Sequence, residues 1–142
     1  MRRSDALAEL SRDHHQALFA AQRLARATPE TANEACAAFQ AFWDRERHHF
    51  RIEEEILLPA LARHVPPDHE AIVRVLTEHV DLRRRARDLV AEPIALRELG
   101  TRLREHVRHE ERTLFPLVQA ALSEDELAEL GATLARHDPA PS

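Results

Sequence analysis

The sequence predicts an all-α protein, and two observations support this prediction. The 142 residues include only two glycines and no tyrosine, and they are rich in alanine, leucine, glutamate and arginine, which favour helix over strand. Prolines cut the chain into four long segments in which apolar residues recur every three or four positions. We therefore expect an up-down-up-down antiparallel four-helix bundle with a short fifth helix at the C-terminal end.

The expected helices are bounded by recognisable start and stop signals. The four long helices should cover about residues 4–27, 30–64, 68–92 and 94–122. Asp68 is the expected N-cap of the third helix, and Ser123 with Glu126 forms a capping box for the fifth, over about 124–137. Short connections make sequential helices antiparallel neighbours, and the length suits one domain over residues 1–142 with the bundle at about 4–122.

Composition excludes several function classes. The net charge is −5 and the arginines alternate with acids, so we expect no nucleic-acid partner. No apolar run reaches the roughly 20 residues of a membrane span, and the N-terminus lacks the pattern of a signal peptide, so we expect a cytoplasmic protein with no membrane partner. Cys36 is the only cysteine, which excludes an internal disulfide and a multi-cysteine zinc site.

The apolar stripes that should form the core have charged or titratable residues at their centres. These residues are His14 in the first helix, Glu46, His49 and Glu53 in the second, His79 in the third, and His106 and Glu110 in the fourth. An isolated buried charge costs several kcal/mol, so these groups need partners, and the sequence offers mainly one another.

The second and fourth helices share an internal repeat. The pattern HxRxEExxLxP occurs at 49–59 and again at 106–116, and the two copies are 57 residues apart. The first and third helices correspond as well, because each has an acid followed by a core-facing histidine, Asp13–His14 and Glu78–His79. The chain therefore consists of two helix pairs related by an approximate twofold.

This arrangement predicts a dinuclear metal site. A histidine and a glutamate four residues apart lie on one face of a helix, so two such pairs and two further histidines place four imidazoles and two carboxylates around one pocket. Nitrogen and oxygen ligands together suit iron, manganese or zinc, and carboxylates can bridge two ions. The candidate ligands are His14, His49, Glu53, His79, His106 and Glu110.

Some assignments stay open. The apolar stripe favours His14 over His15 as the first-helix ligand, although the residues after His15 would also fit a ligand there. Glu46, His48 and His109 could supply a further ligand or support the others, and Glu46 is the first candidate because it lies on the stripe.

Other charged or punctuating residues have simpler expected roles. We expect solvated side chains at His64, His69, His137, Arg108, Glu111 and Arg112. Pro59 and Pro116 should kink or end their helices just past the metal layer.

The chain resembles the hemerythrin-like or HHE cation-binding domains over about residues 5–120. The resemblance rests on the Asp-His and Glu-His pairs and on HFRIEEEILLP and HVRHEERTLFP. It implies a four-helix bundle whose non-haem di-iron centre is bridged by the two carboxylates and an oxo or hydroxo group, with manganese or zinc as possible substitutes for iron. Carried over by position, the resemblance assigns the ligands to His14, His49, Glu53, His79, His106 and Glu110.

We therefore expect a di-iron protein that binds or senses a diatomic ligand, oxygen or nitric oxide. Oxygen-carrying hemerythrins have a fifth histidine four residues from the one that matches His79, whereas Val75 and Arg83 stand at that spacing here. Fewer nitrogen ligands favour chemistry over oxygen carriage. The first alternative is a protein that repairs iron centres or donates iron, or an enzyme that reacts with peroxide or nitric oxide. The second alternative is a non-catalytic bundle stabilised by a metal such as zinc.

Overall fold

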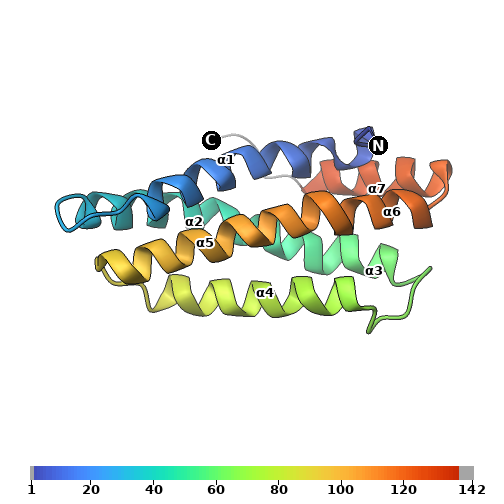
Figure 1. Cartoon of the computed structure of the whole chain (residues 1–142). Coiled ribbons are helices and arrows are strands. Elements are labelled where there is room, and N and C mark those ends of the chain that lie inside the picture. The colour runs from blue at the N-terminus through green and yellow to red at the C-terminus, as the bar shows by residue number, and fades with distance from the viewer. Residues whose placement is uncertain (1, 138–142) are drawn as a thin grey trace.

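The computed structural model describes residues 2–137 and confirms the all-α prediction (Figure 1). Its helices are α1 (Ala8–Ala25), α2 (Ala32–Ile52), α3 (Leu58–Leu61), α4 (Glu70–Arg87), α5 (Pro93–His109), α6 (Phe115–Ala121) and α7 (Glu124–His137). A 3₁₀ turn, Asp5–Leu7, precedes α1. The π-helical turns Glu53–Leu57 and Glu110–Leu114 join α2 to α3 and α5 to α6, so each of these pairs is one continuous rod.

The four rods form an antiparallel bundle. Helix α1 packs against α2 and α5, and α4 packs against the same two helices from the other side (Figure 1). The order around the bundle is therefore α1, α2, α4 and α5. Helix α7 folds back beside the 3₁₀ turn at the N-terminus. Within the described residues, no helix combines the length and the apolar character that a membrane crossing requires.

The predicted N-cap of α4 was one residue too early. The helix begins at Glu70, and its cap is His69, whose Nδ1 accepts a hydrogen bond from the backbone N–H of Ala71 at 3.1 Å. Asp68 lies in the turn that follows two prolines and does not cap the helix. An N-cap must stand directly before the first helical residue to reach its free N–H groups, which excludes Asp68.

The predicted end of α4 was also wrong, because α4 stops at Arg87 and Glu92 belongs to the next helix. The Glu92 carboxylate accepts hydrogen bonds from the backbone N–H groups of Ile94 and Ala95, each at 2.9 Å. Pro93 then occupies the first turn of α5, where a missing N–H costs nothing. The signal interpreted as a stop for one helix is the start of the following one.

The helices do not end at the two repeated prolines, and the alternative expectation, a kink at each proline, stays a prediction. The rod continues to Leu61 after Pro59 and to Ala121 after Pro116. A proline inside a helix lacks an N–H and clashes with the carbonyl four residues earlier. In both rods a wider π-helical turn ends two residues before the proline, where the helix can accommodate this mismatch.

The expected core stripes are largely confirmed, with one choice settled and one correction of register. In α1 helical spacing allows either Ala17 or Leu18 on the stripe, and the structure buries Ala17, at 1% exposure, and leaves Leu18 40% exposed. In α4 the spacing of the apolar residues predicts a stripe of Ile72, Leu76, His79 and Ala86, but Leu76 is 41% exposed and Val75 is fully buried in its place. Either residue of each pair fits a step of three or four, so the stripe alone could not choose between them.

The capping box of α7 is confirmed. The backbone N–H of Glu126 donates to Ser123 Oγ at 3.2 Å, and the backbone N–H of Ser123 donates to Glu126 Oε1 at 3.0 Å. The other carboxylate oxygen of Glu126 lies 2.6 Å from Nε2 of His64. This contact ties α7 to the turn after α3 and gives His64, which was expected to be solvated, a partner at the surface.

Candidate metal centre

Six side chains from all four rods meet in the middle of the bundle, and none is more than 5% exposed. They are His14, His49, Glu53, His79, His106 and Glu110, the same residues that the sequence singles out. They form two groups that share both glutamates, one with His14 and His49 and the other with His79 and His106. In each group, one ligand atom from every residue lies within 4.8 Å of the others, which is close enough for one metal ion.

Each glutamate divides its two oxygens between the two histidine pairs. Glu53 Oε2 lies 3.3 Å from Nε2 of His49, and Glu53 Oε1 lies 3.2 Å from Nε2 of His79. A carboxylate placed in this way can bridge two ions.

Glu110 repeats this arrangement from the opposite rod. Its Oε1 lies 2.7 Å from Nε2 of His14, and its Oε2 lies 3.1 Å from Nε2 of His106. The two glutamates begin the two π-helical turns, so an irregular turn stands at equivalent places in both repeats. Such turns are frequent at functional sites.

A carboxylate on a neighbouring helix holds the outward-facing Nδ1 of every histidine. The four links join His14 to Glu111 at 2.6 Å, His49 to Asp13 at 3.1 Å, His79 to Glu54 at 2.6 Å and His106 to Glu78 at 2.8 Å. Each link fixes the orientation of an imidazole and turns its Nε2 toward the centre, as is usual for histidines that bind metals.

Sequence reasoning missed these four outer carboxylates. Each stands next to an inner residue in the chain and supports a histidine on a different helix, so its partner cannot be identified from one helix alone. The signal was present in the acid before His14 and His79 and in the second glutamate of each Glu-Glu pair. The sequence does not show how far each helix is shifted along the axis of its neighbours.

Glu111 is the clearest case, because we expected it to be solvated. Its Oε2 accepts hydrogen bonds from His14 Nδ1 and from the Ser11 hydroxyl at 2.8 Å, and its Oε1 accepts one from Arg3 at 3.2 Å. Glu111 lies off the apolar stripe of its own helix but faces α1. Arg108 and Arg112 are exposed, as expected.

The cluster contains unsatisfied polar atoms at its centre. Six buried atoms have no hydrogen-bond partner among the described residues: Nε2 of His49, His79 and His106, both carboxylate oxygens of Glu53, and Oε2 of Glu110. An unpaired buried donor or acceptor costs about 1–3 kcal/mol, so a group of six is a strong anomaly for a folded protein. Imidazole nitrogens and carboxylate oxygens are suitable ligands for iron, manganese or zinc, and the donor set therefore fits a pair of such cations.

The electrostatics of the cluster also favour cations. Burial alone would lower the pKa of His14 and His79, but the carboxylates that contact them raise these pKa values to about 9 and about 11. Burial would raise the pKa of Glu110, yet the surrounding histidines, His106 above all, hold it well below its usual range. At neutral pH these pKa values leave the histidines protonated and positively charged beside buried carboxylates. Metal ions can replace these protons.

Two phenylalanines shield the histidines from solvent. The ring of Phe50 stacks on His79 with centroids 3.9 Å apart and an interplanar angle of 4°, and Phe115 stacks on His14 at 5.3 Å and 10°. Both phenylalanines are at most 1% exposed. The walls of the site are thus apolar where they are not ligands, which strengthens electrostatic interactions inside it.

The structure separates the residues whose roles were open. It places His14 in the cluster and leaves His15 exposed. His48 is half-buried and its Nε2 lies 3.0 Å from the backbone oxygen of His137. His109 is buried outside the cluster, and burial lowers its pKa.

Glu46 occupies a special position one helical turn before His49. It is 5% exposed, and its Oε1 lies 4.0 Å from His49 Nδ1. Burial raises the pKa of Glu46 above its usual value, although the positive charge of His49 and His14 opposes this shift. Glu46 therefore borders the cluster without belonging to either group of four.

The two positions where a fifth histidine would stand have other tasks. Val75 is fully buried in the apolar core. Arg83 donates to both oxygens of Glu54, at 2.7 and 3.1 Å, and so supports the carboxylate that holds His79. The centre therefore has four histidines from the four rods.

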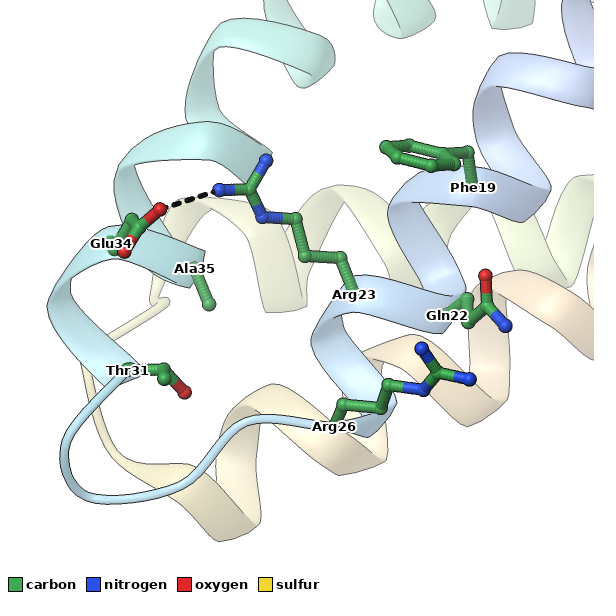
Figure 2. Close-up of a pocket in the computed structure, with 7 residues that line it drawn as sticks. All are labelled: Phe19, Gln22, Arg23, Arg26, Thr31, Glu34 and Ala35. Atoms are coloured by element: carbon green, nitrogen blue, oxygen red, sulfur yellow. Dashed lines mark hydrogen bonds and ion pairs between the residues drawn. The ribbon is translucent and has the colours of Figure 1, made fainter.

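A surface pocket near the α1–α2 connection is unrelated to this cluster (Figure 2). Its lining residues are Phe19, Gln22, Arg23, Arg26, Thr31, Glu34 and Ala35. Arg23 crosses it to form an ion pair with Glu34 at 2.9 Å. It contains no histidine and no member of the buried cluster.

Four rods with a buried histidine and carboxylate cluster at their centre define a helical metal-binding protein. The model of the hemerythrin HHE cation-binding domain matches residues 6–118, and the chain belongs to this family. The matched residues include all six members of the cluster. No curated protein and no solved structure matches the chain.

Proposed function

We propose that the cluster holds two iron ions and that the resulting centre binds or senses oxygen or nitric oxide. The ligands are His14, His49, Glu53, His79, His106 and Glu110. The observation that carries the proposal is the division of Glu53 and Glu110 between the two histidine pairs. That division suits two ions, because the two oxygens of each glutamate face different histidine pairs.

The protein supplies several functions around such a centre. The outer carboxylates keep each Nε2 directed inward and increase the basicity of the imidazoles. Phe50 and Phe115 exclude water from two sides, which protects a bound diatomic ligand from proton-driven side reactions. Ferrous iron in this place would supply the electrons for reversible binding of the ligand.

Metal analysis and absorption spectroscopy test this proposal. Protein from cells grown without added metal should contain about two iron ions per chain, and anaerobic reduction followed by air should produce charge-transfer bands in the near ultraviolet and visible. Protein that contains no iron and stays colourless after loading would contradict the proposal, and stable binding of zinc alone would favour a metal-stabilised bundle.

A matched pair of variants tests the ligand assignment. Glu110→Ala removes a bridging carboxylate and should abolish the bands and the metal content while circular dichroism shows nearly unchanged helicity. His15→Ala is the control, because His15 neighbours His14 in the chain but is exposed. Unchanged metal content in Glu110→Ala would refute the assignment.

A second candidate function is reaction with peroxide or nitric oxide, or donation of iron to another protein. It is favoured by the occupation of both fifth-histidine positions by Val75 and Arg83, which leaves fewer nitrogen ligands and more open positions. Turnover of peroxide or nitric oxide by the iron-loaded protein would support it, and reversible binding without turnover would support the first proposal. The cytoplasmic location expected from the sequence stays a prediction.

A further inference from the structure

The two metal positions have different electrostatic surroundings although the ligands around them are related by the internal repeat. The first position lies between His14 and His49, and the second lies between His79 and His106. Both share Glu53 and Glu110, so any difference between them must come from the residues behind the histidines.

The outer carboxylates of the second position are both neutralised by arginines. Arg83 contacts Glu54 at 2.7 Å, and Arg74 contacts Glu78 at 3.0 Å. Each arginine stands on α4, one turn from its partner or from the histidine that its partner holds. The second position therefore has little net charge in its outer layer.

The first position keeps an excess of negative charge. Arg3 contacts Glu111 at 3.2 Å, but within residues 2–137 no arginine lies within 4.0 Å of Asp13. If His14 is aligned with His79, the positions of Arg74 and Arg83 are taken by Glu9 and Leu18. Helix α1 thus lacks both of the cations that α4 provides.

Glu46 adds a second difference in the same direction. It is 5% exposed, and no hydrogen bond joins it to another residue in the part of the chain that the structure describes. At the equivalent place in the repeat, 57 residues later, stands Leu103, which is 1% exposed. The nearest positive group to this largely buried carboxylate is His49, whose Nδ1 lies 4.0 Å away, so a cation closer to Glu46 would compensate for the cost of its burial.

We propose that the first position binds its metal ion more tightly than the second and fills first, with Glu46 as a third buried carboxylate that acts on this position alone. This inference rests on the proposed two-metal function. It implies that the two ions are inequivalent before any ligand binds.

Anaerobic titration of the metal-free protein with Fe²⁺, followed by calorimetry, tests the inference. The unchanged protein should bind two equivalents in two resolved steps. His49→Ala should remove the tighter step, and His106→Ala should remove the weaker one. Loss of the weaker step in His49→Ala, or two equal steps in the unchanged protein, would overturn the inference.

Two further variants test the cause of the difference. Glu46→Gln should weaken the tighter step by on the order of tenfold and leave the other step unchanged, since one charge is lost at short range in a low-dielectric site. Arg83 is half-exposed, so its substitution should leave the fold intact. Arg83→Gln removes the cation beside Glu54 and should therefore tighten the weaker step. An unchanged tighter step in a folded Glu46→Gln protein would overturn the role of Glu46, and an unchanged weaker step in Arg83→Gln would overturn the charge argument.

The failure of this inference differs from failure of the proposed function. If the protein binds no second equivalent of Fe²⁺ under any condition, the two-metal function is wrong. If it binds two equivalents of equal affinity, the two-metal function stands and the ordered filling is wrong.

Discussion

Two apolar regions lie on either side of the metal centre, and they are built in different ways. The leucine-rich region comprises Leu7, Leu10, Ile52, Leu57, Leu58, Leu61, Ala71, Ile72, Val75, Leu114, Phe115, Val118, Leu122, Leu130 and Leu134. The alanine-rich region comprises Ala17, Ala21, Leu24, Ala27, Ala32, Ala35, Phe39, Phe42, Phe50, Leu82, Ala86, Leu96, Leu99, Leu103 and Val107.

The difference concerns how closely the backbones approach. In the alanine-rich region, a Cβ added to Gly100 of α5 would lie 2.7 Å from the backbone oxygen of Ala21 in α1. In the leucine-rich region large side chains fill the space, and α7 covers it through Leu130 and Leu134. The candidate metal centre lies between these two kinds of packing.

The largest effect on the free energy of unfolding should come from raising the pH of the protein without bound metal, because the histidines between the two regions then lose their protons. The pKa values of His14 and His106 are raised to about 9 and that of His79 to about 11, against 6.5 for an unfolded histidine. Protonation of these histidines therefore stabilises the folded state. The stabilisation is fully present below pH 6.5 and is lost as the pH rises through 9 toward 11. We expect a loss on the order of several kcal/mol in unfolding free energy between pH 7 and pH 10, measured with denaturant.

The composition makes this measurement clean. The chain contains no tyrosine and no lysine, so few other side chains titrate in this alkaline range. The metal-loaded protein is the control, and its stability should change little because its imidazoles are already deprotonated. Equal stability of the metal-free protein at both pH values would show that its histidines are not held protonated.

The next effect should come from the leucine-rich region. Leu57→Ala removes a fully buried side chain and should lower the free energy of unfolding by about 2–5 kcal/mol, because a cavity remains in a region of large residues. Leu18→Ala, at a 40% exposed position, is the matched control. A similar loss in both variants, measured by urea unfolding, would contradict the packing described for Leu57.

Alanine substitutions at the two glycines test how closely the helices approach in the alanine-rich region. Gly100→Ala should destabilise the protein by about 1–3 kcal/mol, because the new methyl group meets backbone atoms of α1 that cannot move independently. Gly131→Ala, whose new Cβ would lie 3.1 Å from Ala6 Cα, meets a less crowded neighbour and gains helix propensity. Thermal unfolding should therefore rank Gly100→Ala clearly below Gly131→Ala, and the reverse order would rule out the close approach of α1 and α5.

The smallest effect should come from the start of α7. Ser123→Ala removes the side-chain cap that accepts from Glu126 and should cost about 1 kcal/mol. Because α7 covers only the leucine-rich region, hydrogen exchange should increase at α7 and leave the alanine-rich region unchanged. Uniform acceleration in both regions would mean that the two regions do not open separately.

The sequence predicted the inner residues better than the helix ends or the outer residues. The six cluster members could be found because a buried stripe with charges at its centre is visible in one helix at a time, and because the pattern repeats. Asp68 and Glu92 were assigned to the wrong roles, since several polar residues near a helix end can cap it and only the backbone decides. Leu76 was preferred to Val75 for a similar reason, because helical spacing leaves two choices at each turn.

The outer residues could not be predicted for a different physical reason. The partner of Glu111 is on α1 and that of Glu54 is on α4. Their roles depend on how far each rod is shifted along its neighbours, and no local pattern in the chain records that shift.

The four links between histidines and outer carboxylates form a closed ring around the bundle. They join α1 to α2, the π-helical turn after α2 to α4, α4 to α5, and the π-helical turn after α5 to α1. In each adjacent pair of residues, one side chain faces the centre and its neighbour in the chain steadies a histidine on the next rod. A one-residue insertion between the loop and the ring would rotate the rod and break its links to both neighbouring rods. The length of each rod up to the ring is therefore under a geometric constraint that composition does not reveal.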